Sequence, residues 1–172
     1  MTTSDWITLG AAILVGGGTL FLGIMAWRAI RQSRSIQKAE KRERLLNEII
    51  EWAISIRVIG FQFQLSIPES KDKLRITRPT LEKIIFAHQI PRQKSIYITH
   101  IARIFGEDLH THAKVVSDNL SDLIYAMSDS ILKQNLKDPA DADKIFEREK
   151  ALKESVELLI EKATDHKVRT IK

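Results

Sequence analysis

The feature that most constrains this chain is an uncharged stretch that runs from Trp6 to Trp27. About 20 apolar residues in a helix reach across a hydrocarbon core of about 30 Å. Tryptophan stands at both ends, where amphipathic rings favour the membrane interface. Five of the seven glycines lie within the stretch, which a helix in lipid tolerates because its backbone must be satisfied internally. We therefore predict a transmembrane helix over residues 6–27, preceded by a short extracytoplasmic tail, residues 1–5.

Other interpretations of this glycine-rich stretch fit less well. A dinucleotide-binding turn needs the pattern G-x-G-x-x-G, and Phe21 occupies the position of the third glycine. A cleaved signal peptide needs a basic start and an apolar run of about 7–15 residues. The chain instead starts with MTTSD, and its apolar run is longer. A buried core helix is a further alternative, and it leaves the concentration of glycine unexplained.

Charged residues beside the stretch predict its orientation. Residues 28–44 include seven basic and two acidic residues, whereas Asp5 is the only charged residue before the stretch. The positive-inside rule places such a basic flank on the cytoplasmic side. We therefore expect a single-pass protein of the cell membrane, with its N-terminus outside and its C-terminus in the cytoplasm.

The distribution of charge argues against nucleic-acid binding. The formal net charge is +5, and a pI of about 9.5 could indicate a nucleic-acid partner. Residues 1–27 carry −1 and residues 28–44 carry +5, which leaves only +1 for residues 45–172. The excess therefore belongs to a basic juxtamembrane helix, residues 28–44, where topology already explains it. The chain has no cysteine, so disulfides and thiol chemistry are excluded.

The remainder, residues 45–172, is predicted to be a cytoplasmic all-α domain with coiled-coil-like helices. Apolar residues recur at spacings of three and four along three segments, as in the helices of a bundle. We expect a short helix over residues 77–90, a long helix from Pro91 to Ile131 that Gly106 bends, and a last helix that opens at Pro139. The helix before them has an inner stripe of Leu45, Ile49, Trp52, Ile56, Ile59 and Phe63. The inner stripe of the last helix is Leu152, Val156, Leu159 and Ala163.

One segment conflicts with an all-helical domain. Residues 59–67 alternate strictly between apolar and polar, which is typical of a strand. Residues 95–99 are rich in β-branched and aromatic residues and could pair with them. The spacing that continues through Phe63 favours a helix, and a small strand pair stays open as the alternative.

Two helical faces are candidate interaction sites. The first is a stripe of small residues in the predicted span, which would let another helix approach closely in lipid. The second is a basic face after the span, which would rest on anionic lipid headgroups. The small-residue stripe consists of Thr8, Ala12, Gly16, Thr19, Gly23 and Ala26, and the basic face of Arg28, Arg31, Arg34, Lys38, Lys41 and Arg42.

The sequence gives little support to a metal site. Glu107 and His110 form one Glu-x-x-His motif, which is half of a di-iron bundle pattern. No other histidine has a glutamate three residues before it. We therefore predict no metal, no cofactor and no catalytic residue.

These features together predict a membrane-anchored helical interaction or scaffold protein that is not an enzyme. We expect it to form a homo-oligomer or to pair with a partner helix in the bilayer. Alternatives are a signalling or sensor module with a bistable bundle, a small metal-binding helical-bundle enzyme, and a pore. A pore needs a polar lumen, and the apolar run offers only Thr8 and Thr19 as polar side chains.

Overall fold

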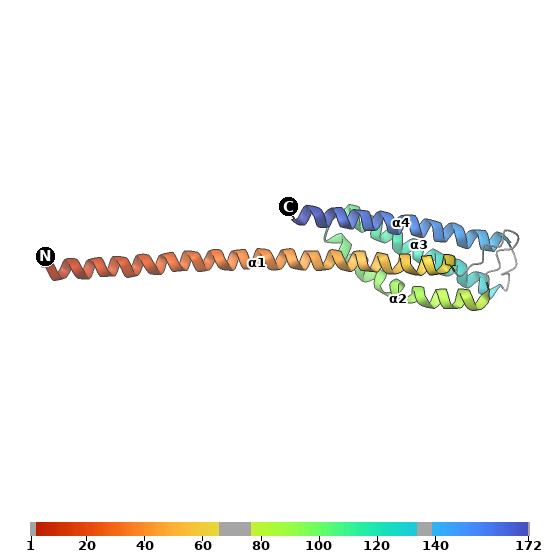
Figure 1. Ribbon diagram of the computed structural model, residues 1–172, viewed down its shortest axis with the longest axis horizontal. Coiled ribbons are helices and arrows are strands. Elements are labelled where there is room, and N and C mark those ends of the chain that lie inside the picture. Colours follow the sequence, from red (N-terminus) through yellow and green to blue (C-terminus); the bar gives the residue numbers. More distant parts are fainter. Residues whose placement is uncertain (1–2, 66–76, 134–138, 172) are drawn as a thin grey trace. The chain divides into compact units, whose positions relative to one another are not determined.

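The computed structural model describes the backbone of residues 3–65, 77–133 and 139–171. Within these ranges the side chains of residues 3–17, 20, 65, 139–141 and 170–171 lie outside the description. The described residues form four helices: α1 (Thr3–Leu65), α2 (Arg78–Arg103), α3 (Glu107–Leu132) and α4 (Pro139–Ile171) (Figure 1). The chain divides into two compact units, Met1–Arg42 and Glu43–Lys172, and α1 contributes to both.

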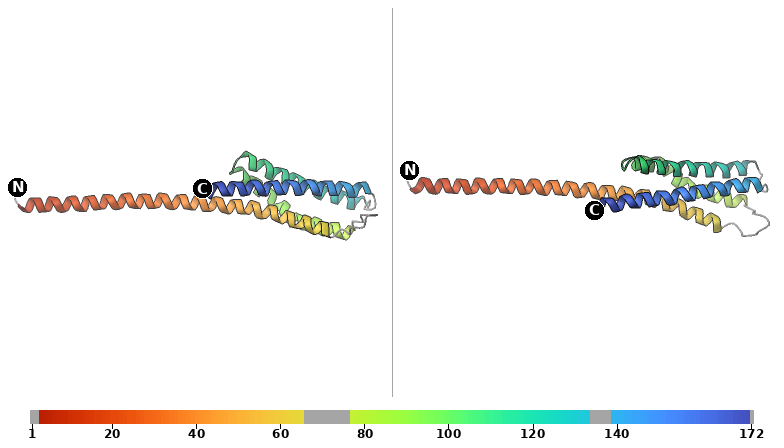
Figure 2. Two further views of the ribbon diagram at one scale, coloured as in Figure 1. Left: turned by 45° about the horizontal axis from the view of Figure 1, so that its top comes forward. Right: turned by 90° about the horizontal axis from the view of Figure 1, so that it is seen from above.

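The second unit is an antiparallel bundle of four helices, in which each helix runs opposite to the next (Figure 2). Side-chain contacts establish the order around the bundle, because α1 touches α2 and α4, and α3 touches the same two helices. In successive contacts the residue number rises along one helix and falls along its neighbour, which is the pattern of antiparallel pairs. The contacts between α1 and α2 are Glu48 with Tyr97 and Trp52 with Pro91, and those between α1 and α4 are Asn47 with Lys167 and Gln64 with Glu149. The contacts between α2 and α3 are Thr99 with His110 and Arg92 with Tyr125, and those between α3 and α4 are Asp108 with Lys162 and Asn119 with Ser155.

The core forms where the apolar stripes of the four helices meet. Fully burying one leucine, isoleucine or phenylalanine side chain stabilises a fold by about 1.5–3 kcal/mol. Each helix contributes such residues at spacings of three and four, so the stripes predicted from the sequence are the packed faces. Among the most buried side chains are Leu46, Ile49, Ile56 and Phe63 of α1, Leu81 of α2, Leu109, Leu120, Leu123 and Met127 of α3, and Ile145 and Leu159 of α4.

The prediction of one long helix from Pro91 to Ile131 is wrong. The chain reverses at residues 104–106, between α2 and α3, instead of at Pro91. Gly106 has a φ of 120°, a conformation that residues with a Cβ rarely adopt. The amides of Ile104 and Phe105 bond to carbonyls three residues before them, which tightens the end of α2. The apolar spacing continues through this turn because both helices face the same core, so spacing alone could not reveal the reversal.

Pro91 lies inside α2 and does not end it. Proline lacks an amide hydrogen, so it normally costs a helix one hydrogen bond and introduces a clash. Here the ring is buried in the core, and the Pro91 carbonyl accepts a hydrogen bond from Trp52 Nε1 at 2.8 Å. Tertiary packing therefore overrides the local preference that predicted a boundary at this residue.

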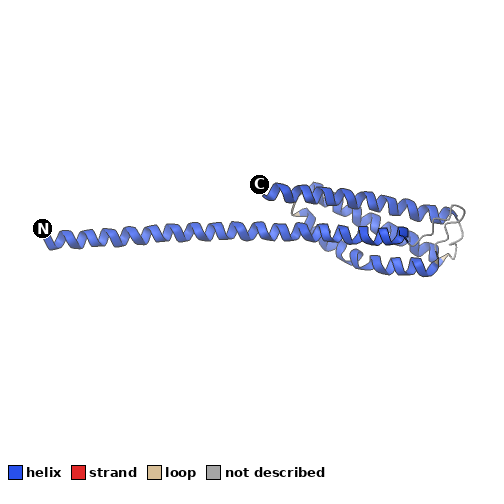
Figure 3. Ribbon diagram, viewed as in Figure 1, coloured by secondary structure: helices blue, strands red, loops and turns tan. Residues whose placement is uncertain are grey.

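The described residues contain helices and no strand (Figure 3). Residues 59–65 are the last turns of α1, and residues 95–99 lie within α2, so they do not form the alternative strand pair. Residues 66 and 67 lie outside the described residues. The predicted start of the last helix is confirmed, since α4 begins at Pro139. The helical bundle predicted from the apolar spacing is confirmed as well.

The structure does not support the predicted membrane span at residues 6–27. Among the residues that it describes, no helix has an apolar stretch long enough to cross a bilayer. The side chains of residues 6–17 and of Leu20, which form much of the predicted span, lie outside the described part of the chain. The backbone of the whole stretch is helical and belongs to α1.

Candidate functional site

The candidate site is a cavity of about 270 Å³ in the bundle, between the C-terminal part of α1 and α4. Ligand pockets in proteins are typically about 300–1,000 Å³, so this cavity suits a small or slender molecule. Its walls are apolar, and a few polar groups lie at its base and rim. The lining residues are Ile56, Arg57, Val58, Gly60, Phe61 and Gln64 of α1 with Glu149, Leu152, Lys153 and Val156 of α4.

Gly60 leaves room for the side chain of Glu149 against α1. A Cβ atom built at Gly60 would lie 3.2 Å from Oε1 of Glu149, which is tighter than most Cβ contacts. Nearby, the rings of Phe63 and Phe146 pack with their centroids 5.8 Å apart and join the same two helices. Because Gly60 has no Cβ atom, the carboxylate of Glu149 can lie against α1 at this residue.

Glu149 is the only acidic residue among the buried polar side chains of the described bundle, with 6% of its surface exposed. The Gln64 side-chain amide donates to Oε1 and Oε2 of Glu149, both at 3.2 Å. Burial raises the pKa of Glu149, because a desolvated carboxylate is costly. The hydrogen bond from Gln64 and the charge of Lys153 lower this pKa and offset part of the rise.

Two exposed cations, Arg57 and Lys153, stand at the rim of the cavity. Neither forms an ion pair with another residue in the described part of the chain. The site thus combines an apolar interior, two cations at its rim and one buried carboxyl whose charged form is disfavoured. Such an arrangement can bind a molecule that has an apolar body and a charged end.

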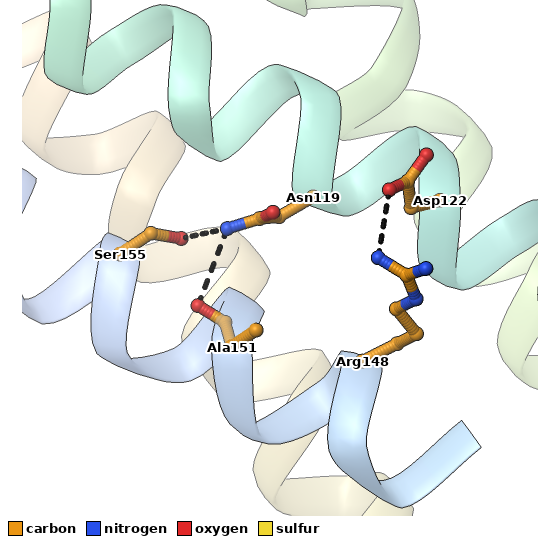
Figure 4. Close-up of polar contacts among 5 residues, drawn as sticks. All are labelled: Asn119, Asp122, Arg148, Ala151 and Ser155. Carbon is orange, nitrogen blue, oxygen red and sulfur yellow. Dashed lines mark hydrogen bonds and ion pairs between the residues drawn. The ribbon is translucent and has the colours of Figure 1, made fainter. Parts of the chain in front are cut away.

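A second, open hollow between α3 and α4 is lined mainly by charged residues, and its contacts fix the two helices together. Arg148 donates to Asp122 Oδ2 at 3.0 Å. Next to this pair, the Asn119 side-chain amide donates to the Ala151 carbonyl at 3.3 Å and to Ser155 Oγ at 3.2 Å (Figure 4). Exposed ion pairs contribute only about 0–1 kcal/mol each. These contacts join α3 to α4 beside the hollow.

The histidines considered as metal ligands are engaged in other contacts. Nδ1 of His110 lies 3.1 Å from the Thr99 carbonyl, and Nδ1 of His112 lies 2.7 Å from the Asp108 carbonyl. The described residues contain no group of three side chains that could hold a metal ion together. The Glu107-x-x-His110 motif therefore lies at the start of α3 without further ligands around it.

His88 is a second polar residue inside the core, with 0% of its surface exposed. Its Nδ1 lies 2.9 Å from the Ile84 carbonyl, and its Nε2 has no hydrogen-bond partner in the described structure. The neutral ring with its proton on Nδ1 donates to that carbonyl. Burial lowers the pKa of His88, because a protonated ring would place a charge in the core.

The two faces predicted as interaction sites both lie on α1. All six residues of the basic face are exposed, and the Arg31 guanidinium lies 5.5 Å from the centroid of the Trp27 ring. In the small-residue stripe, Thr19, Gly23 and Ala26 are exposed, and no atom lies within 4 Å of a Cβ built at Gly23. The side chains at the other three positions of this stripe, Thr8, Ala12 and Gly16, lie outside the described residues.

Sequence reasoning missed the cavity and its polar groups. A signal was present in α4, where the inner stripe extends back from Leu152 and Val156 to Ile145 with the same spacing. Glu149 occupies the inner position between Ile145 and Leu152. A charged residue at an inner position of an amphipathic helix indicates a buried polar contact. The partner on α1 was not visible, because Gln64 and Glu149 are far apart in the sequence.

Comparisons of this chain with protein-family models, with curated proteins and with solved structures found no match.

Proposed function

We propose that this chain is a single-pass, membrane-anchored interaction protein that self-associates and has no enzymatic activity. Residues 6–27 form the anchor, and the bundle, residues 43–172, faces the cytoplasm. The uncharged stretch, its terminal tryptophans and the basic flank support the anchor and its orientation. The exposed basic face of residues 28–42 would rest on anionic lipid headgroups.

The observation that carries the proposal is an exposed apolar stripe on α1, made of Ile54, Val58 and Phe61. Their exposed fractions are 37%, 49% and 60%. The three residues follow one another at spacings of four and three, so they share one face of the helix. The face turned to the core holds Trp52 and Ile56, with exposed fractions of 3% and 1%. An apolar stripe opposite a packed face is typical of a helix that meets a second partner.

The register of this outer stripe favours a second copy of the chain as that partner. Ile54, Val58 and Phe61 lie 42 residues after Ala12, Gly16 and Thr19, which is six heptads. Positions separated by whole heptads return to the same seam of a left-handed coiled coil. If two parallel copies supercoiled along the whole of α1, the small-residue stripe and the outer stripe would share one seam. Between the stripes, the same heptad positions hold Ile30, Ser33, Gln37, Glu40, Arg44, Asn47 and Glu51. Most of these residues are polar, and Asn47 also accepts a hydrogen bond from Lys167 of α4, so the two ends supply most of the apolar contact.

Disulfide crosslinking of the full-length chain in membranes tests this proposal, because the chain has no cysteine of its own. In a parallel pair, the same seam residue of both copies meets, so Val58→Cys should form oxidant-dependent dimers. Val115→Cys on α3 is a matched control, because Val115 is an exposed valine outside the stripe, 43% exposed against 49% for Val58. Equal dimer yields from the two variants would reject the outer stripe as the seam.

A second pair of variants tests the part of the seam in the predicted span. Gly16→Ile places a branched side chain where close packing is needed, and it should reduce the dimer yield of Val58→Cys. Leu14→Ile, about 160° away around the helix, should leave the yield unchanged. The same yield in both backgrounds would mean that the small-residue stripe makes no contribution.

A further inference from the structure

We propose that the cavity between α1 and α4 binds a single-chain alkyl carboxylate, with the alkyl chain inside the cavity and the carboxylate between Arg57 and Lys153. The inference goes beyond self-association: one copy of the bundle supplies every residue of the cavity, although Val58 and Phe61 belong both to the cavity wall and to the outer stripe of the proposed seam.

The apolar walls select the body of this ligand. Ile56, Val58 and Phe61 line the cavity from α1, and Leu152 and Val156 line it from α4. Val58 and Phe61 are also about half exposed, so the cavity opens along an apolar surface that water covers poorly. The cavity volume of about 270 Å³ lies just below the usual range of ligand pockets, so the ligand must be small. Each CH₂ group buried there should strengthen binding about fourfold until the cavity is full.

The charges at the rim select the head of the ligand. Arg57 and Lys153 carry two positive charges and have no ion-pair partner among the described residues. The one acidic group of the cavity, Glu149, is buried, accepts hydrogen bonds from the Gln64 amide and interacts with the charge of Lys153. An anionic head at the rim meets both cations, whereas a cationic head would be repelled by both. The charge pattern therefore favours a carboxylate over an amine of the same chain length.

Photolabelling of the full-length chain in phosphatidylcholine nanodiscs tests the proposal with two matched probes. One is decanoate with a diazirine in its chain, and the other is decylamine with the same diazirine. The decanoate probe should label residues 56–64 and 149–156, and excess unlabelled decanoate should prevent this labelling. The decylamine probe should label these segments at least fivefold less. Amine labelling equal to or stronger than carboxylate labelling, or carboxylate labelling confined to other segments, would overturn the proposal.

Three variants test the role of the individual charges. Arg57→Gln with Lys153→Gln should weaken decanoate labelling by up to about 25-fold, since each exposed ion pair is worth up to about fivefold. Both residues are exposed, so the bundle should keep its fold. Lys94→Gln on α2 removes an exposed charge outside the cavity and should leave labelling unchanged. Glu149→Gln removes the one acidic group and should strengthen labelling. Unchanged labelling in the double variant would also overturn the proposal, whatever the crosslinking of Val58→Cys shows.

Discussion

The indole Nε1 of Trp52 donates a 2.8 Å hydrogen bond to the backbone carbonyl of Pro91 in the interior of the bundle. This contact joins α1 to α2 at the residue where local preference predicts that α2 should end. A buried carbonyl without a partner costs about 1–3 kcal/mol, so the indole matters beyond its apolar surface.

Trp52→Phe should therefore destabilise the bundle. Loss of the donor to the Pro91 carbonyl should cost about 1–3 kcal/mol, and the lost core volume should add to this cost. Denaturant unfolding, followed by circular dichroism, gives the free energy of unfolding. Trp27→Phe is the control, since the Trp27 side chain is 59% exposed and lies outside the bundle. Equal stability of Trp52→Phe and the parent chain would contradict the structural role of this hydrogen bond.

His88 should make the stability of the bundle depend on pH. Its pKa in the folded bundle lies below the ordinary value of 6.5. As the pH falls below about 6.5, the unfolded chain binds a proton there more readily than the folded bundle. The contribution of His88 to the free energy of unfolding should therefore be most favourable above pH 6.5 and decrease at lower pH, by up to about 1.4 kcal/mol per pH unit. His88→Met should flatten this slope, and His100→Gln, at an exposed site, should retain it. A slope that persists in His88→Met would assign it to other groups.

Glu149 should have the opposite effect on stability. Its pKa in the folded bundle lies above the ordinary value of 4.5. The folded state therefore keeps the proton longer than the unfolded chain, and stability is lost as the pH rises from about 4.5 through the folded pKa. Glu149→Gln should raise the unfolding temperature at pH 7 and show little difference from the parent chain at pH 4. A lower unfolding temperature at pH 7 would mean that the charged carboxylate stabilises the bundle.

The proposed topology predicts which ends of the chain can be labelled in intact cells. A cysteine at Thr2 should react with a membrane-impermeant maleimide, because the positive-inside rule places this end outside. A cysteine at Lys172 should react only after the membrane is opened. The reverse pattern would invert the orientation. Labelling of both cysteines only in opened cells, with the chain in the soluble fraction, would reject the anchor.

The sequence determined the features of this protein that depend on neighbouring residues. Spacings of three and four predicted the helical bundle and its inner stripes, because one face of each helix must be buried whatever it packs against. Proline predicted the start of α4 at Pro139, since its ring suits a first turn. The same local rule failed at Pro91, where burial and the contact with Trp52 keep α2 intact.

Only the tertiary structure decided the features that depend on residues far apart in the chain. The reversal at Gly106 separates α2 from α3, although the apolar spacing runs through it without a break. Trp52 and Ile56 of α1 are buried in the core. Ile54, Val58 and Phe61 are exposed. The cavity exists because Gly60 and Gln64 of α1 meet Glu149 of α4. A periodic pattern shows that a helix has an apolar face, and the packing of its neighbours determines which polar groups that face encloses and which apolar residues stay uncovered.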